Sequence, residues 1–477
     1  MSARMENLGI PVETGERGEQ VLLSGKLGKM TLAMQVLTLA VWPLLEQILS
    51  FFVGMTDILI AGRMVTGEAR VAVLDALGLG GFVGWFIYIF QGAVATGVMA
   101  LVSRATGARD SELANRSLGQ GVWLGLLAGT AALVILQVGT PFLISWMGLS
   151  AVAAVHAEEY IRIIAWSGPV AGVMFAVNSA LRGSGDTKTP FFAMVVVNLV
   201  NAGMSLLLVF GEEPFGGHGV AGIAAGTVIG WCAGLFTVVV LVFLKKGGEL
   251  QWSRVGFRFH WETLMRIWRI GVPQALEIAG MWLIHSYALK VIANLNYEGA
   301  LGAHFIAVRL ESMSFLPGFA IASAAGALVG QYLGAGSQEM AVAAVRFSWK
   351  LAVGVMAFMG LCFVLGRYWL IGLMAPGSGL HLELAGPLLV VCALSQPFFA
   401  TCIILKTSMR GAGATNLVMR WAFSSMLFYR IGVLWVLSHF GWITLTGVWI
   451  VLGLDLLTQA IVFTRLHYKG AWLDAKV

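Results

Sequence analysis

The chain has 477 residues, of which 58% are hydrophobic and only 11% are charged, and its mean hydropathy is +0.84. A soluble domain carries about 25% charged residues. This composition therefore excludes a water-facing surface over most of the chain and predicts a polytopic membrane protein. The net charge of +6 does not indicate nucleic-acid binding, because the basic residues gather at the edges of apolar segments.

Apolar segments long enough to cross a bilayer follow one another along the chain. Each is predicted to be an α-helix, because a lipid-exposed backbone must satisfy its own polar groups and these runs are too uniformly apolar for β-barrel strands. The twelve segments lie near residues 36–62, 76–103, 117–140, 157–182, 190–211, 219–244, 263–294, 299–334, 341–366, 381–410, 417–438 and 442–466. The predicted fold is all-α, with twelve transmembrane helices.

Basic residues favour one side of the predicted membrane. The outer loops hold only Arg63, Arg70 and Arg367, whereas the inner loops hold several times as many Lys and Arg residues. The positive-inside rule therefore places both termini in the cytoplasm. Residues 1–30 are polar and lack the apolar stretch of a secretory signal peptide, so a cytoplasmic N-terminal segment is expected.

An internal repeat divides the chain. Leu181–Thr187 (LRGSGDT) and Met409–Thr415 (MRGAGAT) end the fourth and tenth spans. About 230 residues separate these motifs, and a similar separation relates Pro43 to Pro273. Further pairs at nearly this separation are Pro169 with Pro397 and Gly107-Ala108 with Gly334-Ala335. Each repeat has an even number of spans, so the repeats share one membrane orientation and are related by a pseudo-two-fold axis along the membrane normal.

This organisation predicts two six-helix lobes. The N-lobe is expected at residues 31–245, a cytoplasmic linker at 246–261, the C-lobe at 262–466 and a cytoplasmic tail at 467–477. Parallel repeats of this kind are a transporter architecture, with substrate sites between or within the halves.

The repeated motif places an arginine at a predicted helix end in each half. Arg182 and Arg410 there suit both the helix dipole and an anionic leaflet. Lys406, four residues before Arg410, is expected to reach the inner membrane surface. The glycines of the motif suit the positive φ of a helix C-cap. They are Gly183, Gly185, Gly411 and Gly413.

The first span, Val41–Gly62, carries two carboxylates, Glu46 and Asp57. A charged side chain within a membrane helix is costly and is by default a functional hypothesis. Asp57 is expected to take up a proton or Na⁺; the alternative is a structural pairing with Arg63. Tyr287 occupies the place of Asp57 in the second repeat, so this acid belongs to the first half alone.

Two other carboxylates lie beside prolines that can kink their helices. Glu46, followed by Gln47, comes three residues after Pro43, and Glu277 comes four residues after Pro273. Each carboxylate is a candidate for binding a proton or a cationic substrate. The alternative is a hydrogen bond to a freed carbonyl or to a neighbouring glutamine.

The second half contains a further polar cluster, which could relay protons and bind substrate or could tie neighbouring helices together as an ion-paired network. Its members are His285, Tyr287, Arg309 and Glu311. Arg430 and Asp455 lie near the middle of adjacent spans and are expected to form a buried structural ion pair. The four cysteines show no metal-ligand spacing and are expected to pack as small hydrophobic residues. They are Cys232, Cys362, Cys392 and Cys402.

The sequence resembles the multidrug and toxic compound extrusion (MATE) family over residues 31–466. The resemblance rests on VWPLLEQILSFFVGMTDILIAGRM, LRGSGDTKTP, GVPQALEIAGMW and AVRLESMSFLPGFAIASAAGALVGQYLGAG, in this order and repeat spacing. It implies a V-shaped pair of lobes and a secondary antiporter that exports organic cations or other amphipathic compounds in exchange for H⁺ or Na⁺.

The resemblance also implies a coupling-ion site. The family's acidic residue of the first span matches Asp57, with Asn178 and Asn198 as nearby polar partners. Asn198 and Asn201 are also candidates for helix–helix hydrogen bonding. The chain departs from some members because the fourth span has acids only at its outer end, Glu158 and Glu159, and the tenth span has no aspartate.

The expected function is thus export of amphipathic cations across the plasma membrane by an H⁺- or Na⁺-coupled antiporter. The protein is expected to work as a monomer in the lipid bilayer. It is expected to need no cofactor and to bind no nucleic acid. A lipid-linked oligosaccharide or metabolite flippase of the same superfamily is the alternative. An enzyme is disfavoured because no HExxH, GxSxG triad or P-loop motif is present.

Overall fold

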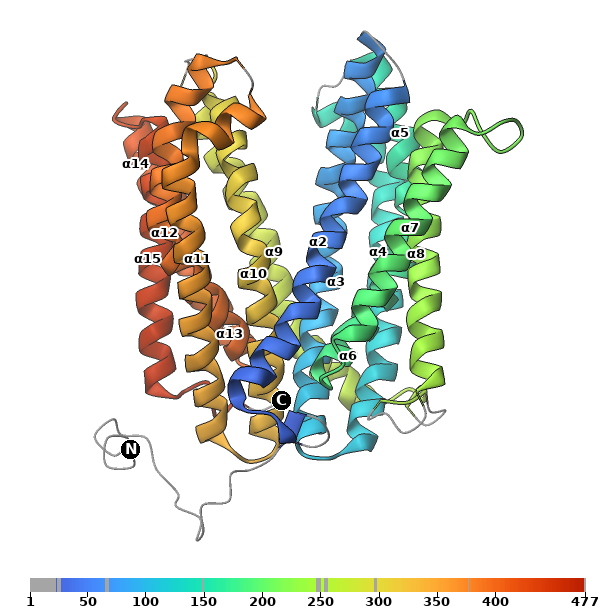
Figure 1. Cartoon of the computed structure of the whole chain (residues 1–477), viewed down its shortest axis with the longest axis vertical. Helices are drawn as coiled ribbons and strands as arrows, with labels where there is room; N and C mark the ends of the chain where they lie inside the picture. Colours follow the sequence, from blue (N-terminus) through green and yellow to red (C-terminus); the bar gives the residue numbers. More distant parts are fainter. Residues whose placement is uncertain are drawn as a thin grey trace. The chain divides into compact units, whose positions relative to one another are not determined.

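The computed structural model of the protein describes residue 23 and residues 27–64, 68–147, 150–245, 250–252, 256–295, 298–375 and 377–475. Within these ranges every regular element is a helix (Figure 1). Eleven helices are long and apolar enough to cross a membrane, and a bent pair of helices makes the twelfth. The predicted all-α fold is therefore confirmed. Much of the predicted segment 1–30, and part of the linker 246–261, lie outside the described residues.

The first repeat begins with the short 3₁₀ helix η1 (Leu27–Lys29). Its longer helices are α2 (Leu32–Met64), α3 (Glu68–Gly107), α4 (Ser111–Met147), α5 (Ala151–Ile164), α6 (Ser167–Gly183), α7 (Lys188–Phe210) and α8 (Gly219–Leu244). The pair α5 and α6 is bent by 45° and together forms the fourth span. Pro169 has no N–H for the carbonyl of Ala165, and the N–H of Gly168 bonds that carbonyl instead at 2.9 Å. The helix therefore breaks just before this proline.

The second repeat follows the same order. Its helices are α9 (Trp261–Ala293), α10 (Ala300–Gly334), α11 (Gln338–Met374), α12 (Gly379–Gly411), α13 (Thr415–Met426), the π-helical η2 (Leu427–Val433), α14 (Leu434–His439) and α15 (Leu445–Lys469). The segments α13, η2 and α14 run on as a single span. The fourth span of the first repeat is thus matched by the continuous α12, which keeps Pro397 inside the helix.

The turns after the fourth and tenth spans have the same backbone. Gly185 has a φ of 92° and Gly413 a φ of 93°, as predicted for glycines beyond a helix end. Gly183 and Gly411 differ from the prediction, because both lie inside their helices. They serve close packing instead: a Cβ on Gly411 would lie 2.3 Å from the carbonyl oxygen of Gly326 on α10.

The chain folds into two compact units. The N-terminal unit holds Val41–Thr106 and Asp110–Ala275, and the C-terminal unit holds Leu276–Val477 together with Met1–Ala40 and Gly107–Arg109. Helices α2 and α9 therefore each divide between the units, close to their prolines. Residues 31–40 and 262–275 thus fall in the opposite unit from the lobe that the sequence suggested.

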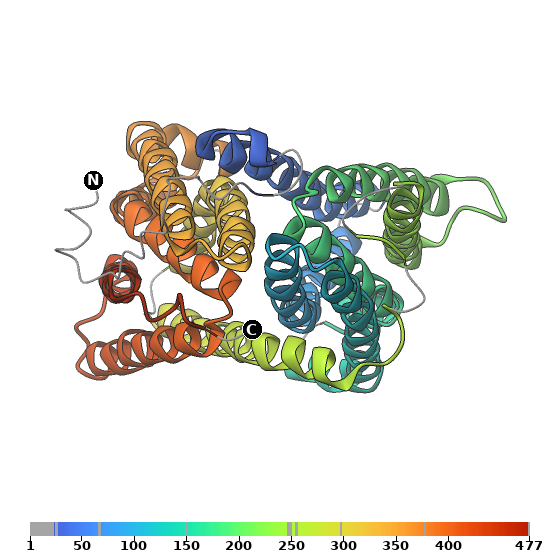
Figure 2. The ribbon, with the colours of Figure 1, turned by 90° about the horizontal axis from the view of Figure 1, so that it is seen from below.

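Hydrophobic packing explains why the start of α2 belongs to the C-terminal unit. Val36, Leu39 and Ala40 are buried in one hydrophobic cluster with Leu328 of α10 and Ile404 of α12. The N-terminal unit has its own cores, one of which joins Ile60 of α2 to helices α3, α5, α7 and α8. Within this unit α7 and α8 lie side by side along their length (Figures 1 and 2).

Glycine pairs bring α4 and α6 into close contact. A Cβ on Gly129 of α4 would lie 2.2 Å from the carbonyl oxygen of Gly168 on α6, and one on Gly172 would lie 2.1 Å from the carbonyl oxygen of Gly125. These distances leave no room for a side chain, so the two backbones touch directly, as small residues permit between membrane helices.

We expect Gly129→Val to destabilise the N-terminal unit, because the added atoms meet the backbone of α6 rather than a side chain that can move. Overpacking of this kind costs about 1–3 kcal/mol. The matched control is Gly139→Val on the same helix, where a Cβ meets nothing within 4 Å. The thermal unfolding midpoints of the purified variants measure the effect, and equal midpoints would contradict the packing account.

Candidate functional site

Asp57 of α2 is the centre of a buried polar site in the N-terminal unit. Its side chain is only 4% exposed. The hydroxyl of Tyr160 on α5 lies 3.2 Å from Asp57 Oδ2, and Asn201 Nδ2 on α7 lies 3.3 Å from Oδ1. Thr227 Oγ1 on α8 lies 3.0 Å from Oδ2. Three helices besides α2 therefore each direct one neutral donor at the same carboxylate.

The donors are also connected to one another. Asn201 Nδ2 lies 2.8 Å from Thr227 Oγ1, and Thr227 Oγ1 lies 3.2 Å from the carbonyl oxygen of Ile223. A threonine hydroxyl carries a single proton, so Thr227 can donate either to Asp57 or to the carbonyl oxygen of Ile223, but not to both at once. The amide oxygen of Asn201 is buried and has no hydrogen-bond partner among the residues that the structure describes. The site thus contains more acceptor oxygens than its own protons can satisfy.

No cation in the described part of the chain forms an ion pair with this carboxylate. Arg63, the alternative partner, is exposed at the end of α2. A buried carboxylate without a paired cation is costly in a membrane. Uptake of a proton or a small cation would remove that cost, which makes Asp57 suited to reversible binding.

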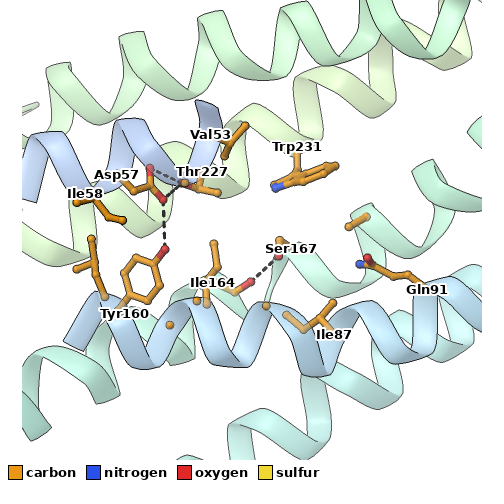
Figure 3. Close-up of a pocket in the computed structure, with 16 residues that line it drawn as sticks. Val53, Asp57, Ile58, Ile87, Gln91, Tyr160, Ile164, Ser167, Thr227 and Trp231 are labelled. Carbon is orange, nitrogen blue, oxygen red and sulfur yellow. Dashed lines mark hydrogen bonds between the residues drawn. The ribbon is translucent and has the colours of Figure 1, made fainter. Parts of the chain in front are cut away.

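Asp57 opens onto a cavity of about 260 Å³ in the same unit (Figure 3). Asp57 and Tyr160 lie toward one end of the cavity, and Trp231 and Gln91 toward the other (Figure 3). Two glycines of α3, Gly81 and Gly84, line the space between these two ends and leave it open. A Cβ on either would meet nothing within 4 Å. The cavity therefore combines an acid, an aromatic ring and an amide.

The glycine-rich stretch of α3 also positions Tyr160. A Cβ on Gly80 would lie 2.3 Å from Tyr160 Cε1, so only a glycine at this position admits the tyrosine ring. The sequence signal for this contact was the run Leu77–Gly81, which was attributable to helix packing alone. Tyr160 and Thr227 themselves gave no signal, because single hydroxyls are common in membrane helices.

The hydrogen bonds found at Asp57 do not involve the two asparagines expected beside it, Asn178 and Asn198. Asn198 donates to the carbonyl oxygen of Met194 on its own helix at 2.9 Å. Asn201, three residues later, is the residue of α7 that faces Asp57. Asn178 of α6 is 4% exposed and does not line the cavity beside Asp57. Sequence alone could not choose between Asn198 and Asn201, because one helical turn separates them.

The proline-adjacent carboxylates form ion pairs. Glu46 Oε1 lies 2.5 Å from Arg182 Nη2, and the glutamate is 6% exposed. Glu277 Oε2 lies 2.7 Å from Arg410 Nη2, and its Oε1 lies 2.7 Å from Lys406 Nζ. Lys406 was expected to extend to the membrane surface, but its side chain turns toward the buried Glu277. The ion pair compensates the charge of the lysine and that of the glutamate together. Gln47, beside Glu46, is half-buried.

The polar residues predicted to cluster in the second half lie on α9 and α10. His285 lies near His304, with ring centroids 6.1 Å apart, and Trp449 Nε1 donates to His304 Nδ1 at 3.1 Å. Glu311 shares a hydrogen bond with Cys392. The remaining candidates are Tyr287, which packs beside a hydrophobic cluster, and Arg309, whose backbone carbonyl accepts from Ser312. His304 lies on the same helix as Arg309 and Glu311 and was not singled out from the sequence.

Asp455 of α15 carries the most completely compensated charge. Arg430 Nε lies 2.6 Å from its Oδ2, while Ser425 Oγ and Gln459 Nε2 lie 2.6 Å and 2.8 Å from its Oδ1. Arg430 lies in the π-helical η2, where the wider turn aims the guanidinium at α15. Arg430 and Asp455 therefore form the ion pair that their positions suggested.

Known proteins resemble the chain over most of its length. The chain is 24% identical over 441 residues to the probable multidrug resistance protein NorM of Thermotoga maritima, with 92% of each chain covered. It is 24% identical over 442 residues to the probable multidrug resistance protein YoeA of Bacillus subtilis, covering 91% of this chain and 93% of that one.

Solved structures share the fold. An outward-facing multidrug resistance MATE family transporter of the MOP superfamily matches with a TM-score of 0.82 at 19% identity, covering 94% of this chain and 98% of that one. A MOP superfamily transporter from Pyrococcus furiosus, described as having a binding pocket of reverse polarity, matches with a TM-score of 0.81 at 18% identity over 92% and 97%.

The family model MatE matches residues 27–207 and 273–436, one block in each repeat. These blocks contain the first-span acid, both proline kinks and both arginine–glycine turns. The chain is therefore a multi-pass membrane protein that belongs to the MatE family, the multidrug and toxic compound extrusion family that its sequence resembles.

Proposed function

We propose that the protein is a cation-coupled antiporter that exports amphipathic organic cations across a bacterial plasma membrane by alternating access. The observation that carries the proposal is Asp57: a buried carboxylate held by neutral donors alone and open to a cavity. The relatives named as probable multidrug resistance proteins support drug export as the activity.

The coupling ion is H⁺ or Na⁺, and it binds at Asp57. A proton on either carboxylate oxygen would be shared with the neighbouring hydroxyls. Na⁺ would find oxygen ligands in the carboxylate, in Thr227 Oγ1 and in Asn201 Oδ1, which has no hydrogen-bond partner. Oxygen atoms are the ligands that hard cations prefer. Either ion lowers the cost of burying the charge, so occupancy stabilises the packed arrangement of α2, α5, α7 and α8.

The exported molecule competes with the ion for the same carboxylate. A cationic head group at Asp57 would leave the apolar part of the molecule against Trp231, whose ring face attracts cations and flat aromatic groups. Drug-sized ligands occupy pockets of about 300–1,000 Å³. The cavity of about 260 Å³ therefore takes part of such a molecule. Displacement of one cation by the other is the elementary step of antiport.

In this proposal both termini lie in the cytoplasm, because the basic loops favour that side of the membrane. The protein works as a monomer in the bilayer and takes no cofactor, since ion and substrate meet within one chain. A flippase for lipid-linked oligosaccharides is the alternative function. The carboxylate in the cavity favours a cation over the phosphates of such a lipid.

Asp57→Asn should abolish coupled export, because the amide keeps the shape of the side chain but cannot take up a cation. We expect at least a tenfold fall in the rate of drug transport in proteoliposomes, with an unchanged yield of folded protein. Glu158→Gln is the matched control, since Glu158 forms an exposed pair with Arg162 on a helix of the same unit. Full antiport by the Asp57→Asn protein would contradict the proposed coupling site.

The driving ion can be identified with the same proteoliposomes. A fluorescent organic cation is loaded under a proton gradient, a sodium gradient or neither, each imposed separately. Transport under only one gradient identifies the ion. Uptake that follows neither gradient, or transport of a lipid-linked sugar in place of the cation, would contradict antiport of organic cations.

Gly80→Val should impair transport more strongly than Gly78→Val. The valine at position 80 would displace the Tyr160 ring and remove one donor from Asp57, whereas a Cβ at position 78 meets nothing within 4 Å. We expect the half-saturating ion concentration to change severalfold for Gly80→Val alone. Equal ion dependence of both variants would mean that Tyr160 does not set the properties of the carboxylate.

A further inference from the structure

Both repeats place a buried glutamate of the first span against an arginine at the end of the fourth. In the first repeat the partners are Glu46 and Arg182, and in the second they are Glu277 and Arg410. Each glutamate is less than a tenth exposed. The two pairs correspond through the internal repeat, although the distance from proline to glutamate differs by one residue. Each repeat thus contains its own copy of the same glutamate–arginine ion pair.

The second repeat adds another cation to this pair. Lys406 precedes Arg410 by four residues on α12, so both side chains lie on one face of the helix. Lys406 Nζ lies 2.7 Å from Glu277 Oε1, while Arg410 Nη2 lies 2.7 Å from Oε2. Each oxygen of this carboxylate therefore has its own cationic partner, and the cluster carries a net positive charge.

The first repeat lacks that second cation. The residue four positions before Arg182 is Asn178, which corresponds to Lys406 through the repeat. Arg182 Nη2 contacts Glu46 Oε1, and the other oxygen, Oε2, is buried with no hydrogen-bond partner among the described residues. Asn178 Oδ1 is buried and likewise has no partner in that part of the chain, and the residue is 4% exposed. By the repeat correspondence, these two acceptor oxygens take the place of the ammonium group of the second repeat.

We propose that the first repeat binds a free monovalent cation at this place, with Glu46 Oε2 and Asn178 Oδ1 as ligands. A carboxylate oxygen and an amide oxygen are the donor types that a hard cation such as Na⁺ takes. The cation would compensate two acceptors that are costly to leave unpaired in a membrane. The loaded site would also carry the same net charge as the cluster of Glu277, Lys406 and Arg410, which the fold already accommodates.

This cation site is separate from the site at Asp57. The two acids are eleven positions apart on α2, which corresponds to about 16 Å along a helix. Asp57 is held by α5, α7 and α8, whereas Glu46 is held by Arg182 of α6. The proposal therefore does not depend on ion coupling at Asp57.

The test measures equilibrium binding of ²²Na⁺ to the purified full-length protein, with Asp57→Asn present in every sample to remove the other candidate site. We expect this protein to bind one sodium ion saturably. Asn178→Lys, which supplies the tethered ammonium of the second repeat, should weaken sodium binding at least tenfold. Asn178→Leu removes the amide oxygen without adding a charge and should also weaken it.

Lys406→Asn provides the reciprocal variant, because it gives the second repeat the residue of the first. We expect it to bind one additional sodium ion. Size-exclusion profiles and thermal midpoints identify which variants are folded, and Asn178→Leu decides the question if Asn178→Lys does not fold.

Two results would overturn the proposal. One is that the Asp57→Asn protein binds no sodium saturably, in which case the Asn178 amide group donates to Glu46 instead. The other is that folded Asn178→Lys and Asn178→Leu proteins bind sodium within twofold of the Asp57→Asn protein. A loss of sodium binding on Asp57→Asn itself, measured against the unmodified chain, reports on the coupling site and not on this one.

Discussion

The cost of a carboxylate inside a membrane is the constraint on which this structure depends. Four buried acids meet it in different ways. Among the described residues, Glu277 has two cationic partners, Asp455 has an arginine and two neutral donors, Glu46 has one arginine, and Asp57 has neutral donors. Exchangeable cations are expected at Asp57 and Glu46, where the protein compensates the charge least, whereas Glu277 and Asp455 hold helices together.

The internal repeat shows which residues the two halves share and in which residues they differ. Both halves share a proline inside the first helix, the arginine–glutamate pair and the left-handed glycine after the fourth span of the repeat, with φ of 92° at Gly185 and 93° at Gly413. These shared features build the frame. The halves differ at Asp57, which has Tyr287 as its counterpart, and at Asn178, which has Lys406. Both differences leave the first half with acceptors that lack a tethered cation.

Much of the fold was predictable from sequence, because hydropathy and charged loops report directly on membrane spans. Asp57, Arg430 and Asp455 were equally visible, since an ionised residue stands out in an apolar run. The partners of Asp57 were not, because Tyr160 and Thr227 are ordinary membrane-helix residues and helical phase separates Asn198 from Asn201. The pairing of Lys406 with Glu277 was missed for a related reason: a lysine near a helix end reaches water or an acid equally well, and only packing decides.

The π-helical turn at Leu427–Val433 has a consequence for how the second half could change over evolution. Such a turn holds one extra residue without breaking the helix. Because the wide turn absorbs the extra residue, removing that residue would return the segment to α-helical geometry and leave α13 and α14 close to their present phase. Arg430 lies within the wide turn, so the direction of its side chain would change and its ion pair with Asp455 would be lost. A deletion at this place would therefore remove a buried ion pair while leaving the flanking helices where they are.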